Sequence, residues 1–424
     1  MIAEVTTKIS LIVKDEVLRK RILFVFFALI IFRVLAAIPI PGVDALRLEE
    51  FFSNNQFLGL LNIFSGGGLS NLSVVMLGVA PYITASIIMQ LLTVMVPKLK
   101  AMYSEEGEAG KKKFTQYSRM LTVPLALMQS FGFLMILQRQ GILMDLGFFE
   151  LLLNMLIVTG GSILLMWIGE LITEFGIGNG VSLIIFAGIV AGLPTAVQQL
   201  IFTFDVSQIP LYLGFAVAAV LVIAGVVIVT EAERPIPITY ARRVRGMKTY
   251  GGISTYLPLR VNQAGVMPII FALSILLFPQ MILSFFAGSG SGFVNTVSNA
   301  LLSVLNNGWI YSALYFVLVF LFTYFYTAVT FDPNQISKNL QKSGAFIPGV
   351  RPGQNTSEYI GKILTRLTLV GATFLGAIAV LPLGMQAATG ITTFAIGGTA
   401  LLIAVSVILD LVRKVESQLS IKEY

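Results

Sequence analysis

Residues 75–96 read VMLGVAPYITASIIMQLLTVMV, an apolar stretch without a single charged side chain. About 20 such residues in a helix match the thickness of the hydrocarbon core of a bilayer. We therefore interpret this stretch as a transmembrane helix and look for others like it.

The composition of the whole chain agrees with a membrane protein. Of its 424 residues, 56% are apolar and 12% are charged, whereas soluble domains carry about 25% charged residues. The mean hydropathy is +0.88. Lipid must cover much of the outside, so we expect an all-α polytopic membrane protein.

Ten apolar stretches are long enough to span a bilayer as helices. The first is not expected to be a cleaved signal peptide, because Pro39 and Pro41 follow it in place of a small-residue cleavage site. The predicted spans are 22–38, 75–96, 119–138, 150–169, 181–202, 211–230, 263–287, 308–330, 364–385 and 393–411.

The basic residues predict the orientation, because Lys and Arg resist translocation. Nearly all of the 28 Lys and Arg residues lie in alternate connections and at the two ends of the chain. Arg47 and Arg139 lie in the opposite loops, and Arg33 lies late in the first span. We expect both termini and these basic connections to face the cytosol. The basic segments are 1–21, 97–119, 231–262, 331–366 and the tail after 411.

The N-terminal segment 1–21 places Val5, Ile9, Ile12 and Val13 at helical spacing with charges between them. This pattern fits an amphipathic helix on the cytosolic membrane surface. It fits equally a solvated tail that only retains positive charge.

The residue types exclude much familiar chemistry. The chain has no Cys and no His, which removes thiolate nucleophiles, imidazole bases and the usual zinc ligands. Residues 107–112 lack the glycine spacing and the Ser or Thr of a phosphate-binding loop. We expect no catalytic site, metal or cofactor.

The membrane interior offers few ionisable groups for ion coupling. Glu170, Glu174, Glu231 and Asp410 all lie at span ends, where a carboxylate reaches water. A coupling role for Glu170 is the remaining alternative for a solute transporter.

The connection 39–74 is too apolar for an ordinary loop and too interrupted for a span. Its segment 62–72 contains three consecutive glycines, Gly66, Gly67 and Gly68, which form a movable joint. Irregular backbone at membrane depth requires a surrounding protein or water-filled cavity. We interpret 62–72 as a re-entrant element, with an interfacial loop as the alternative.

The connection 231–262 alternates apolar and polar residues on both sides of Gly246, Gly251 and Gly252. This pattern predicts a β-hairpin that projects from the membrane. Its net charge is positive, which suits an acidic protein surface or RNA phosphate. A solvated basic loop is the alternative.

The connection 331–362 contains Arg351 between two Pro-Gly pairs, Pro348-Gly349 and Pro352-Gly353. Two such pairs predict turns that hold the arginine at a defined place. Arg351 is therefore the strongest docking candidate among the residues considered singly.

Five motifs along nearly the whole chain resemble the SecY family of protein-translocation channels. They occur in the family's order, and together they are highly specific. The motifs are Gly78-Val-Ala-Pro-Tyr-Ile-Thr-Ala-Ser-Ile-Ile-Met-Gln-Leu-Leu92, Gly176-Ile-Gly-Asn-Gly180, Leu257-Pro-Leu-Arg-Val-Asn-Gln-Ala-Gly-Val-Met-Pro268, Arg351-Pro-Gly353 and Thr365-Arg-Leu-Thr-Leu-Val-Gly371.

The resemblance implies ten transmembrane helices in two inverted five-helix halves, with a re-entrant plug segment and a lateral opening between the second and seventh spans. The expected divisions are a cytosolic segment 1–21, a first half 22–202, a second half 203–411 and a cytosolic tail 412–424.

The resemblance also assigns roles to residues that would otherwise be ordinary packing positions. A pore ring would consist of Val79, Ile83, Ile185, Ile270 and Ile403. The plug would be Asn62, Ile63, Phe64, Ser65, Gly66, Gly67, Gly68, Leu69, Ser70, Asn71 and Leu72. The lateral gate would include Thr84, Ile87, Gln90, Asn262, Phe278 and Ile282. Docking would involve Arg242, Arg243 and Arg351.

The function implied is a non-enzymatic channel in the cytoplasmic membrane. It would pass unfolded secretory polypeptides outward and release transmembrane segments sideways into lipid. Implied partners are the SecE and SecG subunits, the SecA motor ATPase, the ribosome, signal peptides, client proteins and membrane lipids. The alternatives are an inverted-repeat solute transporter and a membrane transferase, for which the chain lacks a mid-membrane polar site and a carboxylate cluster.

Overall fold

The computed structural model describes most of the chain. The described residues are 14–41, 65, 67–69, 71–139, 141–143, 147–202, 209–240, 243–245, 248–250, 254–286, 292–305, 307–389 and 392–423.

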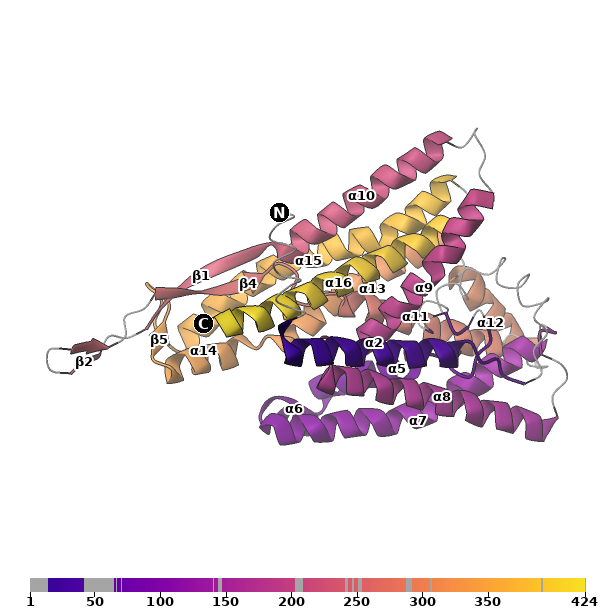
Figure 1. Ribbon diagram of the computed structural model, residues 1–424, viewed down its shortest axis with the longest axis horizontal. Coiled ribbons are helices and arrows are strands. Elements are labelled where there is room, and N and C mark those ends of the chain that lie inside the picture. The colour runs from indigo at the N-terminus through magenta and orange to yellow at the C-terminus, as the bar shows by residue number, and fades with distance from the viewer. Residues whose placement is uncertain are drawn as a thin grey trace.

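Long helices lie side by side along the molecule (Figure 1). Every predicted span coincides with a helix. In the first half these are α2 (Glu16–Ala36), α5 (Ala80–Met95), α7 (Gly107–Arg139), α8 (Phe148–Phe175) and α9 (Gly180–Phe202). In the second half they are α10 (Ile209–Glu231), α11 (Met267–Phe286), α13 (Gly308–Thr330), α15 (Gln354–Thr389) and α16 (Thr392–Glu423).

Five helices of the described chain are long and apolar enough to cross a membrane, and the bent pair α5 and α6 (Pro97–Ser104) adds a sixth. Among the described residues, shorter apolar helical stretches lie in α9 (Gly180–Gly192) and α11 (Met267–Gln280). The fold is therefore a polytopic helical membrane protein.

Several boundaries differ from the prediction. The second span is helical only from Ala80, because Pro81 begins a helix well but cannot continue one, and residues 74–79 form turns. Helix α2 starts at Glu16, capped by Asp15, and includes only the last six residues of the predicted surface segment 1–21; residues 1–13 of that segment lie outside the described residues. Helix α12 (Gly292–Leu305) was not anticipated.

A small sheet lies at one end of the molecule (Figure 1). Strand β1 (Glu233–Tyr240) pairs antiparallel with β4 (Ser254–Arg260), with Ile236 opposite Leu257. A short strand β5 (Ala345–Phe346) joins the other edge of β1, giving the order β4-β1-β5. Strands β2 (Arg243–Arg245) and β3 (Lys248–Tyr250) form a second hairpin. The predicted hairpin in 231–262 is confirmed.

The sheet packs its apolar side on the helices below it. Ile236 and Leu259 are buried against Ile360 and Ile363 of α15, with Ile336 of α14 (Pro333–Lys342) at the edge of this cluster. Because alternate residues of a strand point to opposite faces, the other face of the sheet remains in water.

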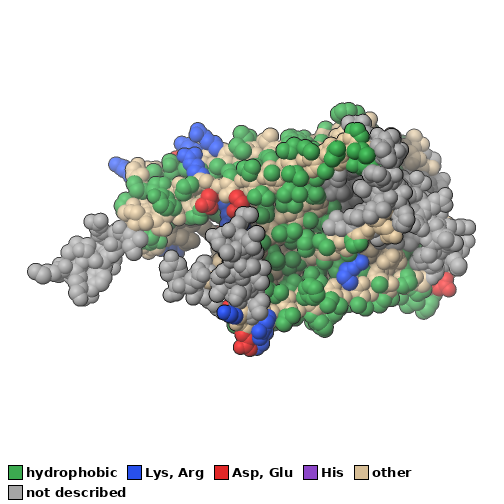
Figure 2. Space-filling model, turned by 45° about the horizontal axis from the view of Figure 1, so that its top comes forward, with side chains coloured by type: hydrophobic (Ala, Val, Ile, Leu, Met, Phe, Trp, Pro, Cys, Tyr) green, Lys and Arg blue, Asp and Glu red, His purple; other side chains and the backbone are tan. Residues whose placement is uncertain are grey.

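Charged side chains gather mainly at the sheet end of the molecule, and the flank is largely apolar (Figure 2). The apolar flank suits contact with lipid, and the charged end suits contact with water.

Candidate functional site: a central apolar ring and a basic docking surface

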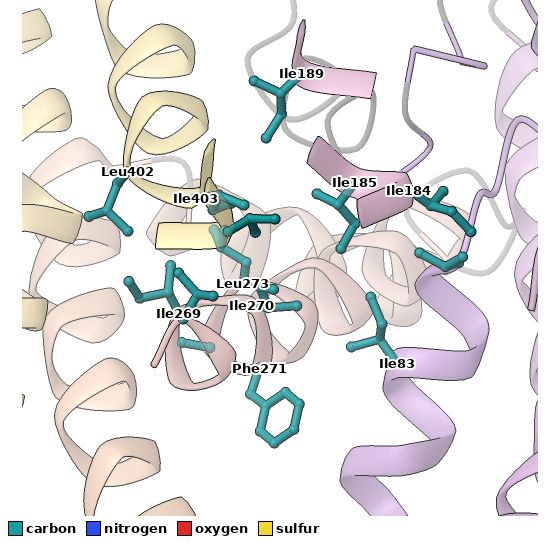
Figure 3. Packing of buried hydrophobic residues seen from close by; sticks show 14 of the residues in the cluster. Ile83, Ile184, Ile185, Ile189, Ile269, Ile270, Phe271, Leu273, Leu402 and Ile403 are labelled. Carbon is teal, nitrogen blue, oxygen red and sulfur yellow. The ribbon is translucent and has the colours of Figure 1, made fainter. Parts of the chain in front are cut away.

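The five predicted ring residues lie in one buried cluster at the centre of the molecule. Figure 3 shows Ile83, Ile185, Ile270 and Ile403 converging from α5, α9, α11 and α16. Val79 precedes the first turn of α5 and belongs to the same cluster. None of these five residues is more than 5% exposed, so all of them are buried in this structure.

Local sequence features bring these helices together. A side chain at Gly180 would collide with the Gly169 carbonyl of α8, so the absence of one lets α9 begin close to α8. The Oδ1 atom of Asn179 accepts a hydrogen bond from the Ser182 amide at 3.2 Å and so caps the start of α9. The Gly176–Gly180 motif thus leads from the end of α8 into the start of α9.

The ring neighbourhood holds no described group suited to ion coupling or metal binding. Glu170, the candidate coupling residue, accepts a hydrogen bond from the Nε of Arg119 on α7 at 2.7 Å. An ion pair of this kind ties α8 to α7 rather than leaving a carboxylate available. Among the described residues, no group of three or more Asp or Glu side chains is placed to hold a metal ion.

The predicted lateral gate lies where α5 packs against α11. Ile87 of α5 is buried in the central cluster, and Thr84 donates to the Ala80 carbonyl at 3.0 Å. Phe278 and Ile282 of α11 are both partly exposed. The gate candidates therefore lie on or next to two helices that pack together, and Phe278 and Ile282 reach the surface.

Two polar side chains among the gate candidates are not fully satisfied within the described part of the chain. Asn262, just before α11, is buried and donates to the Gly265 carbonyl at 3.3 Å, but its Oδ1 has no partner there. Gln90 on α5 is partly exposed, but its buried Oε1 also has no partner there. A buried polar group without a partner costs about 1–3 kcal/mol.

The described part of the predicted plug forms tight turns beside α7 and α8. Leu69 and Leu72 are buried in a second apolar cluster with Phe133 and Leu134 of α7. The Leu69 amide donates to the Ser65 hydroxyl at 2.9 Å. Asn62, Ile63, Phe64, Gly66 and Ser70 lie outside the described residues.

Two backbone positions in this segment have positive φ angles, Gly67 at 82° and Leu72 at 40°. For leucine this conformation is strained, at a cost of about 1–2 kcal/mol. A Cβ at Gly67 would lie 3.3 Å from the Arg33 guanidinium of α2. The segment is thus held between helices in a conformation that its sequence does not favour by itself.

The basic docking candidates lie at the sheet end. Arg351 is exposed, in the loop between β5 and α15, and Gly349 and Gly353 have φ angles of 81° and 103°. These angles confirm the predicted Pro-Gly turns. Arg243 lies in β2, and Arg242 is outside the described residues.

Side chains missed by the sequence reasoning fix the Arg351 loop. Thr356 donates to the Arg351 carbonyl at 2.9 Å, and Ser337 of α14 donates to the Gly353 carbonyl at 2.6 Å. Both hydroxyl-bearing residues are buried. Ser337 is far from the loop in sequence, so no local pattern indicates this contact.

A second missed contact fixes the base of the sheet. Arg413 of α16 donates through Nε to Glu231 at 2.9 Å, and its NH2 nitrogen pairs with Glu231 and with the Thr230 carbonyl. Glu231 ends α10 two residues before β1. The pair therefore ties the last helix to the start of the hairpin.

Comparison with known proteins gives the same assignment over most of the chain. The family model described as SecY matches residues 73–412. A protein translocase subunit SecY of Escherichia coli is 44% identical over 417 residues, covering 96% of this chain and 93% of that protein. The Mycobacterium bovis protein of the same name is 42% identical over 429 residues and covers 96% of both.

Solved structures share the fold. A structure described as a protein conducting channel superposes with a TM-score of 0.67 at 18% identity, covering 96% of this chain and 93% of that one. A second structure, described as a SecY whose plug domain stabilises the closed state, gives a TM-score of 0.65 at 18% identity, with the same coverage of both chains. Canine Sec61 in a ribosome-channel complex gives a TM-score of 0.61 at 16% identity, again with the same coverage of both chains. The chain belongs to the SecY family.

Proposed function

We propose that this protein is the channel subunit through which unfolded secretory polypeptides cross the cytoplasmic membrane. The observation that carries the proposal is the apolar ring, which joins α5, α9, α11 and α16 at the centre of the molecule. The family assignment supports the same function, and it does not favour the solute-transporter alternative.

The ring suits a seal that opens around a chain. Apolar side chains at a constriction exclude water and ions by dewetting, and they form no directional bonds that a passing polypeptide must break. Val79, Ile83, Ile185, Ile270 and Ile403 would move apart when a chain enters and close behind it. The protein itself performs no catalysis in this scheme.

The seam between α5 and α11 is the proposed lateral gate for transmembrane segments. Separating these helices would expose the unpaired oxygens of Gln90 and Asn262 to water, which offsets part of the cost of opening. Thr84, Ile87, Phe278 and Ile282 would line the opened seam toward lipid.

The segment 62–72 is the proposed plug. Its described residues pack against α7 and α8 beside the ring cluster, and its glycines and the strained Leu72 favour a segment with a second conformation. A plug function is stated for the SecY of one similar structure. In our proposal the segment leaves its site when the channel opens.

The sheet end is the proposed docking surface for the source of energy. Arg351 on its fixed loop, with Arg243 of β2 and Arg242 next to it in the sequence, would bind acidic groups of the SecA motor ATPase or phosphates of the ribosome. A ribosome complex is named for canine Sec61. SecE and SecG are proposed as companion subunits within the membrane.

The proposed orientation places the sheet end and both termini in the cytosol, following the basic residues. The proposed units are the segment 1–21, the halves 22–202 and 203–411, and the tail 412–424. The ion pair between Arg413 of α16 and Glu231 at the end of α10, together with the packing of α15 on α16, supports treating the second half as one unit.

The test is transport of a radiolabelled, signal-bearing unfolded precursor into vesicles that contain this protein, SecE and the motor with ATP. We expect full-length precursor protected from protease, and none in vesicles without the channel. No protection with assembled proteins and an active motor would refute the proposal.

A further inference from the structure

Helix α12 (Gly292–Leu305) has no role in the channel as described so far. It follows the gate helix α11, packs against α11 and α13, and lies at the end of the molecule away from the sheet (Figure 1). Its sequence contains no charged residue.

One face of α12 is an exposed apolar stripe. The stripe consists of Phe293, Val297, Leu301 and Val304, which are spaced by four, four and three residues and so share one side of the helix. Phe293 is 81% exposed, and the other three are each more than 40% exposed. Nothing in the chain's own described structure covers this side.

The remaining circumference divides into two further sides. Ser298 is buried where α12 meets its neighbours. The third side is polar: Asn299 donates to Asn295 Oδ1 at 2.7 Å, and Thr296 and Ser303 are exposed. A helix with a protein-facing, an apolar exposed and a polar exposed side fits a boundary between lipid and water.

The neighbouring helix places that boundary. Helix α13 begins at Gly308, within three residues of the end of α12, and it is one of the spans apolar enough to cross the membrane. Trp309 in its first turn is 81% exposed, and Ile310 and Leu314 beside it are exposed as well. Exposed tryptophan at the start of a span is typical of the membrane interface.

We infer that α12 is an interfacial helix that inserts Phe293, Val297, Leu301 and Val304 into the lipid surface and thereby anchors the adjoining end of α11. The proposed occupant of the stripe is lipid, because α12 leads within three residues into α13, a span with exposed apolar residues in its first turns, and because the stripe carries no charge. The consequence for α11 rests on its proposed role as gate helix. Opening the gate would then require α12 to shift in the lipid surface.

The location can be tested by depth-dependent fluorescence quenching. The chain has only two tryptophans, Trp167 and Trp309, so changing both to Phe gives a silent background. In this background, Phe293→Trp is compared with Asn299→Trp on the polar side. The full chain is assembled with SecE in vesicles whose lipids carry bromine about 5–10 Å below the headgroup boundary.

We expect Phe293→Trp to lose most of its emission to the brominated lipid, whereas Asn299→Trp is quenched by iodide in the water. Val304→Trp serves as a second probe of the stripe if Phe293→Trp does not assemble. Equal quenching of both sides by iodide would overturn the inference. Chemical cross-linking of the stripe to a second copy of the chain would overturn it as well.

The anchoring role is tested by resting ion leakage through the same vesicles. Phe293→Ser combined with Val297→Ser removes apolar anchors, so leakage should rise above the parent, while Thr296→Ala combined with Ser303→Ala should match it. Unchanged leakage with normal quenching would overturn the anchoring of α11. Loss of precursor transport by the parent protein with normal quenching would contradict the proposed function and leave the location of α12 intact.

Discussion

The central ring and the sheet end of this protein are built by opposite means. The ring residues meet by apolar contact alone, in a cluster drawn from helices far apart in sequence. The Arg351 loop is instead fixed by directional hydrogen bonds from Thr356 and Ser337 and by two glycines with positive φ.

The difference indicates how each region works. Apolar packing tolerates changes of shape at constant volume, which suits a seal that must yield to polypeptides of any sequence. Directional bonds hold one arginine in one place, which suits recognition of a particular partner. Substitutions should therefore have large effects at the sheet end and small effects in the ring.

The largest effect is expected from Arg351→Glu. Reversing the charge at a docking site both removes a favourable contact and adds repulsion, which is worth several kcal/mol, so motor-driven transport should fall more than about tenfold. Precursor protection in vesicles measures this.

The matched control for that change is Lys342→Glu, the same charge reversal on the exposed last turn of α14. It should retain most of the transport, and both variants should insert into the membrane in normal amounts. Near-normal transport by Arg351→Glu would remove the docking role.

A smaller effect is expected from the supports of the loop. Ser337→Ala and Thr356→Val each remove one hydrogen bond to the Arg351 loop, worth about 0.5–1.5 kcal/mol. At limiting motor concentration transport should fall about two- to tenfold for each. Ser343→Ala, which removes an exposed bond within the end of α14, is the control, and an equal loss there would argue against positioning of Arg351.

Gly67→Ala tests whether the proposed plug turn tolerates substitution, as expected of the ring, or is sensitive to it, as expected of the Arg351 loop. Alanine at a φ angle of 82° costs about 1–2 kcal/mol, and its methyl group would press on Arg33. We expect a several-fold rise in resting ion leakage. Gly132→Ala, with open space around it in α7, should leave leakage unchanged, and a silent Gly67→Ala would weaken the plug assignment.

The smallest effects are expected within the ring itself. Ile185→Val and Ile403→Leu keep the ring apolar and cost at most about 1.5 kcal/mol. Transport and resting leakage should stay within about twofold of the parent. Ile403→Asn, which places a smaller and polar side chain in the ring, should raise leakage clearly. Strong transport defects from the apolar exchanges would contradict a seal made by non-specific packing.

The sequence was sufficient for features that depend on local patterns. Each of the ten predicted apolar stretches falls on a helix, alternation predicted the β1–β4 hairpin, and the Pro-Gly pairs predicted the turns around Arg351. Each of these rests on residues close together in the chain.

The sequence was insufficient for features that depend on distant residues. Ser337 is hydrogen-bonded to the Gly353 carbonyl 16 residues later in the sequence, and Arg413 is hydrogen-bonded to Glu231, which is 182 residues away in the sequence. The ring residues looked like any other apolar residues until the fold brought them together, and only the family resemblance singled them out. Helix α12 was missed because its apolar stripe is too short for a span.

The central claim, that a polypeptide passes through the apolar ring, can be tested by disulfide formation with an arrested precursor. The chain contains no Cys, so Ile83→Cys or Ile403→Cys introduces a single thiol in the ring, and Leu221→Cys introduces one on the exposed side of α10. A precursor with one Cys, stopped midway by a folded domain, should cross-link to the ring positions and not to position 221. Protected precursor that cross-links to position 221 and never to the ring would contradict this account.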